Sequence, residues 1–181
     1  MKTESTVKYV LRLALTLLAI TAVVAAALAG VNSITAPAIA ELTAQKTQEA
    51  IELVLPGGGE PTDFPETALV SKVYASDTGY AVEVTPGGFD NTITMMVGVD
   101  KAGSVLGISI ISHTETAGLG AVAAAGTPAG EAFRAGFVGK SGSVSVTKDG
   151  GEINAITSAT ITSRAVCVGV NAALEVVAQM G

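Results

Sequence analysis

Asn154-Ala155-Ile156-Thr157-Ser158-Ala159-Thr160-Ile161-Thr162-Ser163 is a hydroxyl-rich run that stands a few residues after Gly150-Gly151 and directly before an apolar helical pattern. That pattern consists of four residues sharing one face of a helix: Cys167, Val170, Leu174 and Val177. Serine and threonine hydroxyls commonly accept hydrogen bonds from the free N–H groups of a first helical turn. We therefore predict a C-terminal helix that begins just after the run, is capped by Thr162 or Ser163, and packs Cys167 into the core.

Four short β-type runs precede this helix, at residues 69–75, 80–85, 92–99 and 104–112. The connections between them contain turn-forming residues, among them Asp77-Thr78-Gly79 and Pro86-Gly87-Gly88, which favour hairpins. A small antiparallel sheet followed by helices indicates an α+β domain. We assign this domain to residues 61–181.

The beginning of the chain is strongly apolar. Residues 13–31 supply 19 uncharged residues, close to the roughly 20 that a helix needs to cross a bilayer. Three basic residues precede this segment: Lys2, Lys8 and Arg12. No basic residue follows until Lys46, so the positive-inside rule predicts a cytoplasmic N-terminus. We expect residues 1–31 to form this N-terminus and one transmembrane helix of the cytoplasmic (inner) membrane, with the folded domain on the outer face.

A cleavable signal peptide is the alternative, because Ala27-Leu28-Ala29 has the small-x-small form of a cleavage site. The apolar run is longer than the roughly 7 to 15 residues of a signal h-region, which favours the anchor. Beyond it, small polar residues and Pro37 indicate the exit from the membrane. Apolar residues at near-helical spacing then predict an amphipathic connector helix within residues 32–60, ending at Pro56-Gly57-Gly58-Gly59.

Charge and composition exclude several kinds of site. After residue 30 the chain carries seven basic and fifteen acidic residues, and this balance would repel the phosphates of a nucleic acid, which we do not expect as a partner. With Cys167 as its one cysteine, the chain alone builds no disulfide, iron–sulfur cluster or cysteine-based zinc site. The single histidine, His113, leaves at most a metal ligand shared with a partner, so we predict no metal site.

A second motif, His113-Thr114-Glu115-Thr116-Ala117-Gly118-Leu119-Gly120, follows the last predicted strand directly. Its two glycines alone indicate a tight turn, and it lacks the lysine of a phosphate-binding loop. Together with residues 154–163, however, it resembles the FMN-binding domain of the G subunit of Rnf electron-transport complexes and the C subunit of sodium-pumping NADH:quinone reductases. The family motifs are S/T-G-A-T-x-T/S and H-x-E-T-P-G-L-G, with Ala117 here in place of the proline. Further similar patterns follow in the same order over nearly the whole chain, whose length is nearer to that of the Rnf protein.

The resemblance implies a covalent FMN, joined by a phosphoester to Thr160. It also implies that nine further residues form the flavin pocket: Glu115, Thr116, Leu119, Gly120, Thr157, Ser158, Ala159, Thr162 and Ser163. A threonine hydroxyl is a poor nucleophile without an adjacent base, and no His or Cys lies nearby in sequence. Attachment therefore needs another enzyme, which in the family is a flavin transferase that uses FAD as donor.

The resemblance further implies an electron-carrying subunit that is not a complete enzyme by itself and contributes no catalytic residues. Its implied partners are membrane-embedded subunits, a second covalent-flavin subunit and iron–sulfur subunits that link ferredoxin to NAD, coupled to Na⁺ or H⁺ translocation. Two residues depart from the family pattern, namely Ser158 in place of glycine and Asn154 in place of aspartate. A positive φ at Ser158 would be unfavourable. A membrane-tethered scaffold without flavin therefore remains an alternative. A soluble exported flavoprotein is a further alternative, which applies if the N-terminal segment is a signal peptide.

Overall fold

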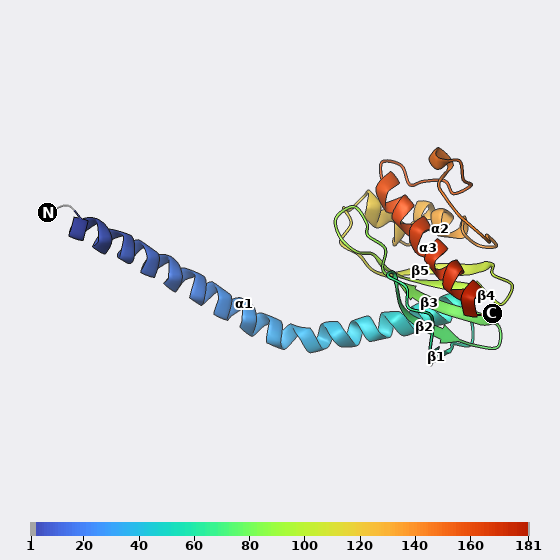
Figure 1. Cartoon of the computed structure of the whole chain (residues 1–181), viewed down its shortest axis with the longest axis horizontal. Coiled ribbons are helices and arrows are strands. Elements are labelled where there is room, and N and C mark those ends of the chain that lie inside the picture. Colours follow the sequence, from blue (N-terminus) through green and yellow to red (C-terminus); the bar gives the residue numbers. More distant parts are fainter. Residues whose placement is uncertain (1–2, 181) are drawn as a thin grey trace. The chain divides into compact units, whose positions relative to one another are not determined.

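The computed structural model describes residues 3–180, which divide into two compact units after Ala44. Helix α1 (Thr3–Val54) forms the first unit and ends in the second (Figure 1). Helix α1 covers both the segment predicted to cross the membrane and most of the predicted connector helix, and it continues without a break through Pro37. The sequence on both sides is rich in alanine and leucine, which favour a helix. This preference offsets the cost of the one backbone hydrogen bond that the proline cannot donate.

Within residues 3–180, two helices are long and apolar enough to cross a membrane, α1 and α3 (Thr160–Met180). None of the residues in the most apolar window of α1 is buried, as is typical of a membrane anchor, whereas most residues of the corresponding window of α3 are buried inside the folded unit. Burial of α3 explains its apolar composition. The N-terminal helix is therefore the one that is consistent with a single-pass anchor.

The second unit contains a five-stranded antiparallel sheet in sequential order. Its strands are β1 (Glu60–Thr62), β2 (Val70–Ala75), β3 (Gly79–Val84), β4 (Thr94–Asp100) and β5 (Val105–Ser112). The predicted α+β class and the four predicted strands are confirmed. Strand β1 was missed because three residues, one of them Pro61, offer too short a pattern to recognise.

Alternating side chains of the sheet pack against helices on its two faces. Val82 and Val97 point into the main core, which they share with α3, whereas Ala81 and Met96 face the end of α1. That end contributes four buried residues: Ala50, Ile51, Val54 and Leu55. A Cβ at Gly98 would overlap the Val54 carbonyl oxygen, so glycine is what allows α1 to lie this close. Only the last turns of α1 therefore belong to the domain core.

Helix α3 lies across the main-core face of the sheet (Figure 1). A Cβ at Gly169 would lie 3.0 Å from Pro86 and 3.1 Å from Val84, which shows how closely helix and sheet approach. Cys167 is buried, as predicted, and desolvation raises the pKa of its thiol to about 11. The shorter helix α2 (Pro128–Ala135) and the 3₁₀ turn η1 (Gly120–Ala123) complete the layer. This framework holds the start of α3 next to the segment that follows β5.

Candidate functional site

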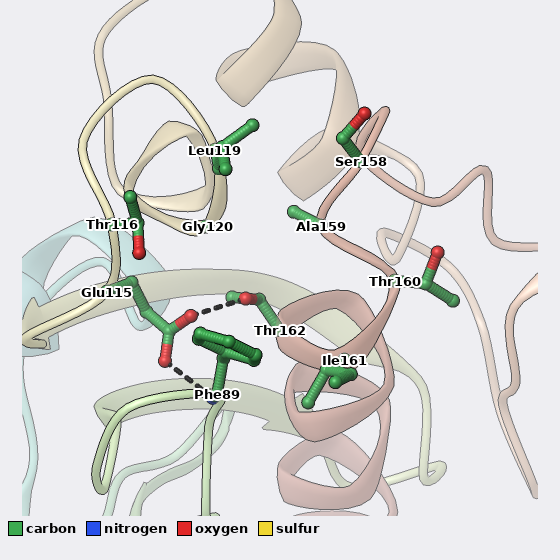
Figure 2. Close-up of a pocket in the computed structure, with 10 residues that line it drawn as sticks. All are labelled: Phe89, Glu115, Thr116, Leu119, Gly120, Ser158, Ala159, Thr160, Ile161 and Thr162. Carbon is green, nitrogen blue, oxygen red and sulfur yellow. Dashed lines mark hydrogen bonds between the residues drawn. The ribbon is translucent and has the colours of Figure 1, made fainter.

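The two sequence motifs, residues 113–120 and 154–163, meet at one cavity of about 250 Å³ beside the start of α3 (Figure 2). Its lining consists of ten residues: Phe89, Glu115, Thr116, Leu119, Gly120, Ser158, Ala159, Thr160, Ile161 and Thr162. Eight of the ten residues predicted for the flavin site are among them. Of the other two, Ser163 is fully buried and Thr157 faces a second cavity.

Glu115 connects the segments that line the cavity by hydrogen bonds. Its carboxylate is buried, with Oε1 accepting hydrogen bonds from the backbone N–H groups of Phe89 at 2.8 Å and Asp90 at 3.4 Å. Its Oε2 accepts a hydrogen bond from the Thr162 hydroxyl at 2.5 Å. A Cβ at Gly120 would overlap this same carboxylate, so glycine is required for the close fit. Glu115 thus joins the β3–β4 loop, the first motif and α3.

The predicted helix cap is wrong, because α3 already begins at Thr160 and places Thr162 and Ser163 inside its first turn. The Ser163 hydroxyl accepts a hydrogen bond from the Ile156 N–H at 3.0 Å and donates one to the Ala159 carbonyl at 2.9 Å. Both hydroxyls therefore tie the helix to neighbouring segments. A run with so many hydroxyls does not by itself indicate which one precedes the helix.

Ser158 adopts a left-handed conformation with φ of 62°, the one positive value at a non-glycine position within residues 3–180. This is the backbone geometry that glycine adopts without steric cost. The substitution noted from sequence thus falls at a position where the backbone favours glycine. The turn nevertheless closes here, with the Ala159 N–H donating to the Ile156 carbonyl at 3.0 Å.

Thr160 occupies the rim of the cavity, and its side chain points away from Glu115 (Figure 2). It is partly exposed, and its Oγ1 accepts a hydrogen bond from Lys148 Nζ at 3.3 Å. Lys148 belongs to the 3₁₀ turn η2 (Thr147–Asp149). The hydroxyl is therefore accessible and lies next to a cation.

Arg164, a basic residue near the start of α3, is engaged with Asp149. Its Nε and Nη2 donate to the two carboxylate oxygens of Asp149 at 2.7 and 2.6 Å. These hydrogen bonds hold the pKa of the Asp149 carboxyl below its usual value and raise that of Arg164. Lys148, which the sequence did not single out, is thus the basic side chain that the structure places at Thr160.

Phe89 and Ile161 were also missed as site residues, and both are largely exposed. Phe89 follows a glycine pair that predicts only a turn, and a single exposed apolar residue is common on protein surfaces, so no sequence signal singled it out. Ile161 lies outside the apolar face formed by Cys167 and Val170. With Leu119, these two side chains give the cavity an apolar border. Within residues 3–180 no cluster of acidic, histidine or cysteine residues is arranged to hold a metal ion.

The fold and the site define a class of protein. Residues 88–175 match the model of the FMN-binding domain family, a range that contains both motifs and the complete cavity lining.

Similarity to individual relatives extends over nearly the whole chain. It is 34% identical to the G subunit of the Na⁺-translocating ferredoxin:NAD⁺ oxidoreductase complex of Acetobacterium woodii, over 93% of this chain and 92% of the relative. It is 32% identical to the G subunit of the proton-translocating complex of Clostridium ljungdahlii, with 82% and 80% covered. The G subunit of an ion-translocating oxidoreductase complex from Methanosarcina acetivorans is 30% identical, with 94% and 95% covered. The chain therefore belongs to the family of G subunits of Rnf-type ion-translocating oxidoreductase complexes.

Proposed function

We propose that this chain carries electrons through an FMN joined covalently to Thr160. The observation that carries the proposal is the position of Thr160, whose partly exposed hydroxyl lies at the rim of the cavity where the two motifs meet. A buried hydroxyl such as that of Thr162 is inaccessible to another enzyme. Thr160 is reachable from solvent and also lines the cavity.

The residues around the cavity fit a flavin. Phe89, Leu119 and Ile161 provide apolar surface for a planar ring system, and Thr116 and Ser158 provide hydroxyls. At about 250 Å³ the cavity lies just below the roughly 300 to 1,000 Å³ of sites that enclose a drug-sized ligand, so it suits part of an FMN rather than all of it. When bound, FMN supplies one-electron or two-electron chemistry, and the protein contributes position and electrostatics.

Attachment depends on a separate flavin transferase with FAD as donor. The Thr160 hydroxyl is contacted by the ammonium of Lys148, which donates a hydrogen bond and does not accept a proton. A threonine needs a neighbouring base to become nucleophilic. The transferase must therefore supply the base, and the chain supplies an accessible hydroxyl on an ordered turn.

Membership in the family supports a place within a larger assembly. We propose that the chain is the G subunit of a membrane ferredoxin:NAD⁺ oxidoreductase, with membrane-embedded, iron–sulfur and second covalent-flavin subunits as partners. The N-terminal helix anchors it with the N-terminus in the cytoplasm, and the FMN domain lies on the outer face. Relatives of similar identity are named for Na⁺ and for proton translocation, so similarity alone does not select the coupling ion.

A membrane-tethered module of this fold without flavin is the second candidate. The observation that favours it is the left-handed Ser158, two residues before the attachment residue. Asn154, which stands where the family has aspartate, lines the second cavity. The absence of the negative charge of that aspartate would weaken recognition by the transferase. This candidate predicts a correctly folded chain that acquires no flavin.

Flavin fluorescence of denatured protein distinguishes the two candidates. The full-length chain is co-expressed with a flavin transferase, and denatured samples are separated on a gel so that only covalent flavin remains. We expect fluorescence in the wild type and in Ser143→Ala, and none in Thr160→Ala. Ser143 is the control because it is an exposed hydroxyl residue that lines neither the cavity at Thr160 nor the second cavity. Absence of fluorescence in the wild type would favour the flavin-free module.

A further inference from the structure

Lys148 is presented by a tightly closed loop. The Thr147 N–H donates to the Ile153 carbonyl at 2.9 Å, and the Gly151 N–H donates to the Val146 carbonyl at 3.1 Å. A Cβ at Gly151 would overlap the Ser145 backbone, so this closure depends on glycine. The backbone that carries Lys148 is therefore fixed by its own hydrogen bonds.

A charged pair then fastens this loop to α3. Asp149, the neighbour of Lys148, receives two hydrogen bonds from Arg164, which lies one helical turn after Thr160. Residues four apart in a helix share a face, so the pair holds the loop against the same side of α3 as Thr160. Because this pairing lowers the pKa of Asp149 and raises that of Arg164, both partners stay charged near neutral pH. Lys148 is thereby held at the Thr160 hydroxyl.

We propose that Lys148 is the phosphate-binding residue of the flavin site; the inference rests on the proposed attachment at Thr160. In the attachment step, Thr160 Oγ1 forms a bond to the phosphorus of the FMN half of FAD. The pyrophosphate P–O bond breaks, AMP leaves with its electron pair, and the hydroxyl proton passes to a base of the transferase. The Lys148 ammonium beside Oγ1 attracts the negatively charged pyrophosphate of the incoming FAD. After the transfer it pairs with the anionic phosphodiester.

The contribution of Lys148 is measured as the rate of covalent flavin incorporation into the full-length chain, with purified transferase and FAD. Lys148→Gln removes the charge, Lys148→Arg keeps it, and Lys101→Gln removes another exposed lysine, which lies in the β4–β5 turn. We expect Lys148→Gln to be about three- to fivefold slower than the wild type, as for loss of an exposed charge contact. Lys148→Arg should recover most of the rate, and Lys101→Gln should not differ from the wild type.

Salt provides an independent readout, because added salt screens an exposed charge contact. The difference between the wild type and Lys148→Gln should shrink as ionic strength rises, while their melting temperatures stay equal. Equal rates for the two chains at low salt would overturn the role of Lys148 and leave attachment at Thr160 intact. A wild type that acquires no flavin would overturn both proposals.

Discussion

Thr160 and Thr162 lie two residues apart in the first turn of α3 and occupy opposite environments. An α-helix turns about 100° per residue, so the two side chains point to different sides. Thr162 is buried and donates to Glu115, whereas Thr160 is partly exposed and accepts from Lys148. We infer that the buried side maintains the structure of the cavity and that the exposed side is left free to react. Substitutions on the two sides test this division.

Removal of Glu115 should have the largest effect. Glu115→Ala leaves the Thr162 hydroxyl and the N–H groups of Phe89 and Asp90 without their acceptor. We expect the free energy of unfolding to fall by about 3 kcal/mol, since buried hydrogen bonds to a charged group contribute strongly. Chemical denaturation of the full-length chain measures this, with the exposed Glu131→Ala as control. A loss as small as that of the control would show that Glu115 does not support the cavity.

The two threonines themselves should respond differently to the same change. Thr162→Val leaves Glu115 Oε2 without its donor and should cost about 1.5 kcal/mol of unfolding free energy. Thr160→Val removes only a surface contact and should stay within about 0.5 kcal/mol of the wild type. Both values come from the same denaturation experiment. Equal losses at the two positions would contradict the assignment of separate roles.

Ser158→Gly tests the turn between the two sides of the site. Glycine accepts the left-handed conformation that serine holds at a cost of about 1 to 2 kcal/mol, and part of this gain is lost because glycine is more flexible when unfolded. We therefore expect a net stabilisation of about 0.5 kcal/mol, with flavin incorporation at least as fast as in the wild type. Ser158→Ala retains the strain and serves as control. A glycine variant less stable than the alanine variant would refute this interpretation.

The Asp149–Arg164 pair on the exposed side should give the smallest effect. Because the pKa of Asp149 in the folded protein is lowered below its ordinary value of 3.8, the contribution of this carboxylate to stability is fully present above that pH. It is lost as the pH falls through the lower folded pKa. The difference in unfolding free energy between the wild type and Asp149→Asn should therefore shrink in acid. Near neutral pH it should reach its full value, which is small. Denaturation curves at several pH values measure it, and a difference that grows in acid would contradict it.

Much of the fold follows from local sequence patterns. Strands between turn residues, the C-terminal helix and a buried Cys167 were predictable because their signals lie within a few residues of one another. The continuous α1 was not, since the cost of one proline competes with helix propensity spread over many residues. The short β1 gave no pattern of its own, because three residues are too few to show an alternation.

The site was predictable as a set of residues but not as an arrangement. Family motifs placed eight residues at the cavity, yet they did not reveal that Glu115 pairs with Thr162 across 47 positions. Nor did they indicate that Lys148 reaches Thr160 or that Phe89 borders the cavity. These contacts depend on how separate loops meet in the folded chain, and no local pattern carries that information.

The most direct test is mass spectrometry of the protein purified from its native membrane, first intact and then as peptides. We predict an added mass of one FMN less one water on the peptide that contains Thr160. Fragmentation should assign that mass to Thr160 rather than to Thr157 or Thr162, and the Thr160→Ala chain should lack it. An unmodified Thr160 peptide from cells that possess the transferase would contradict covalent attachment at this residue.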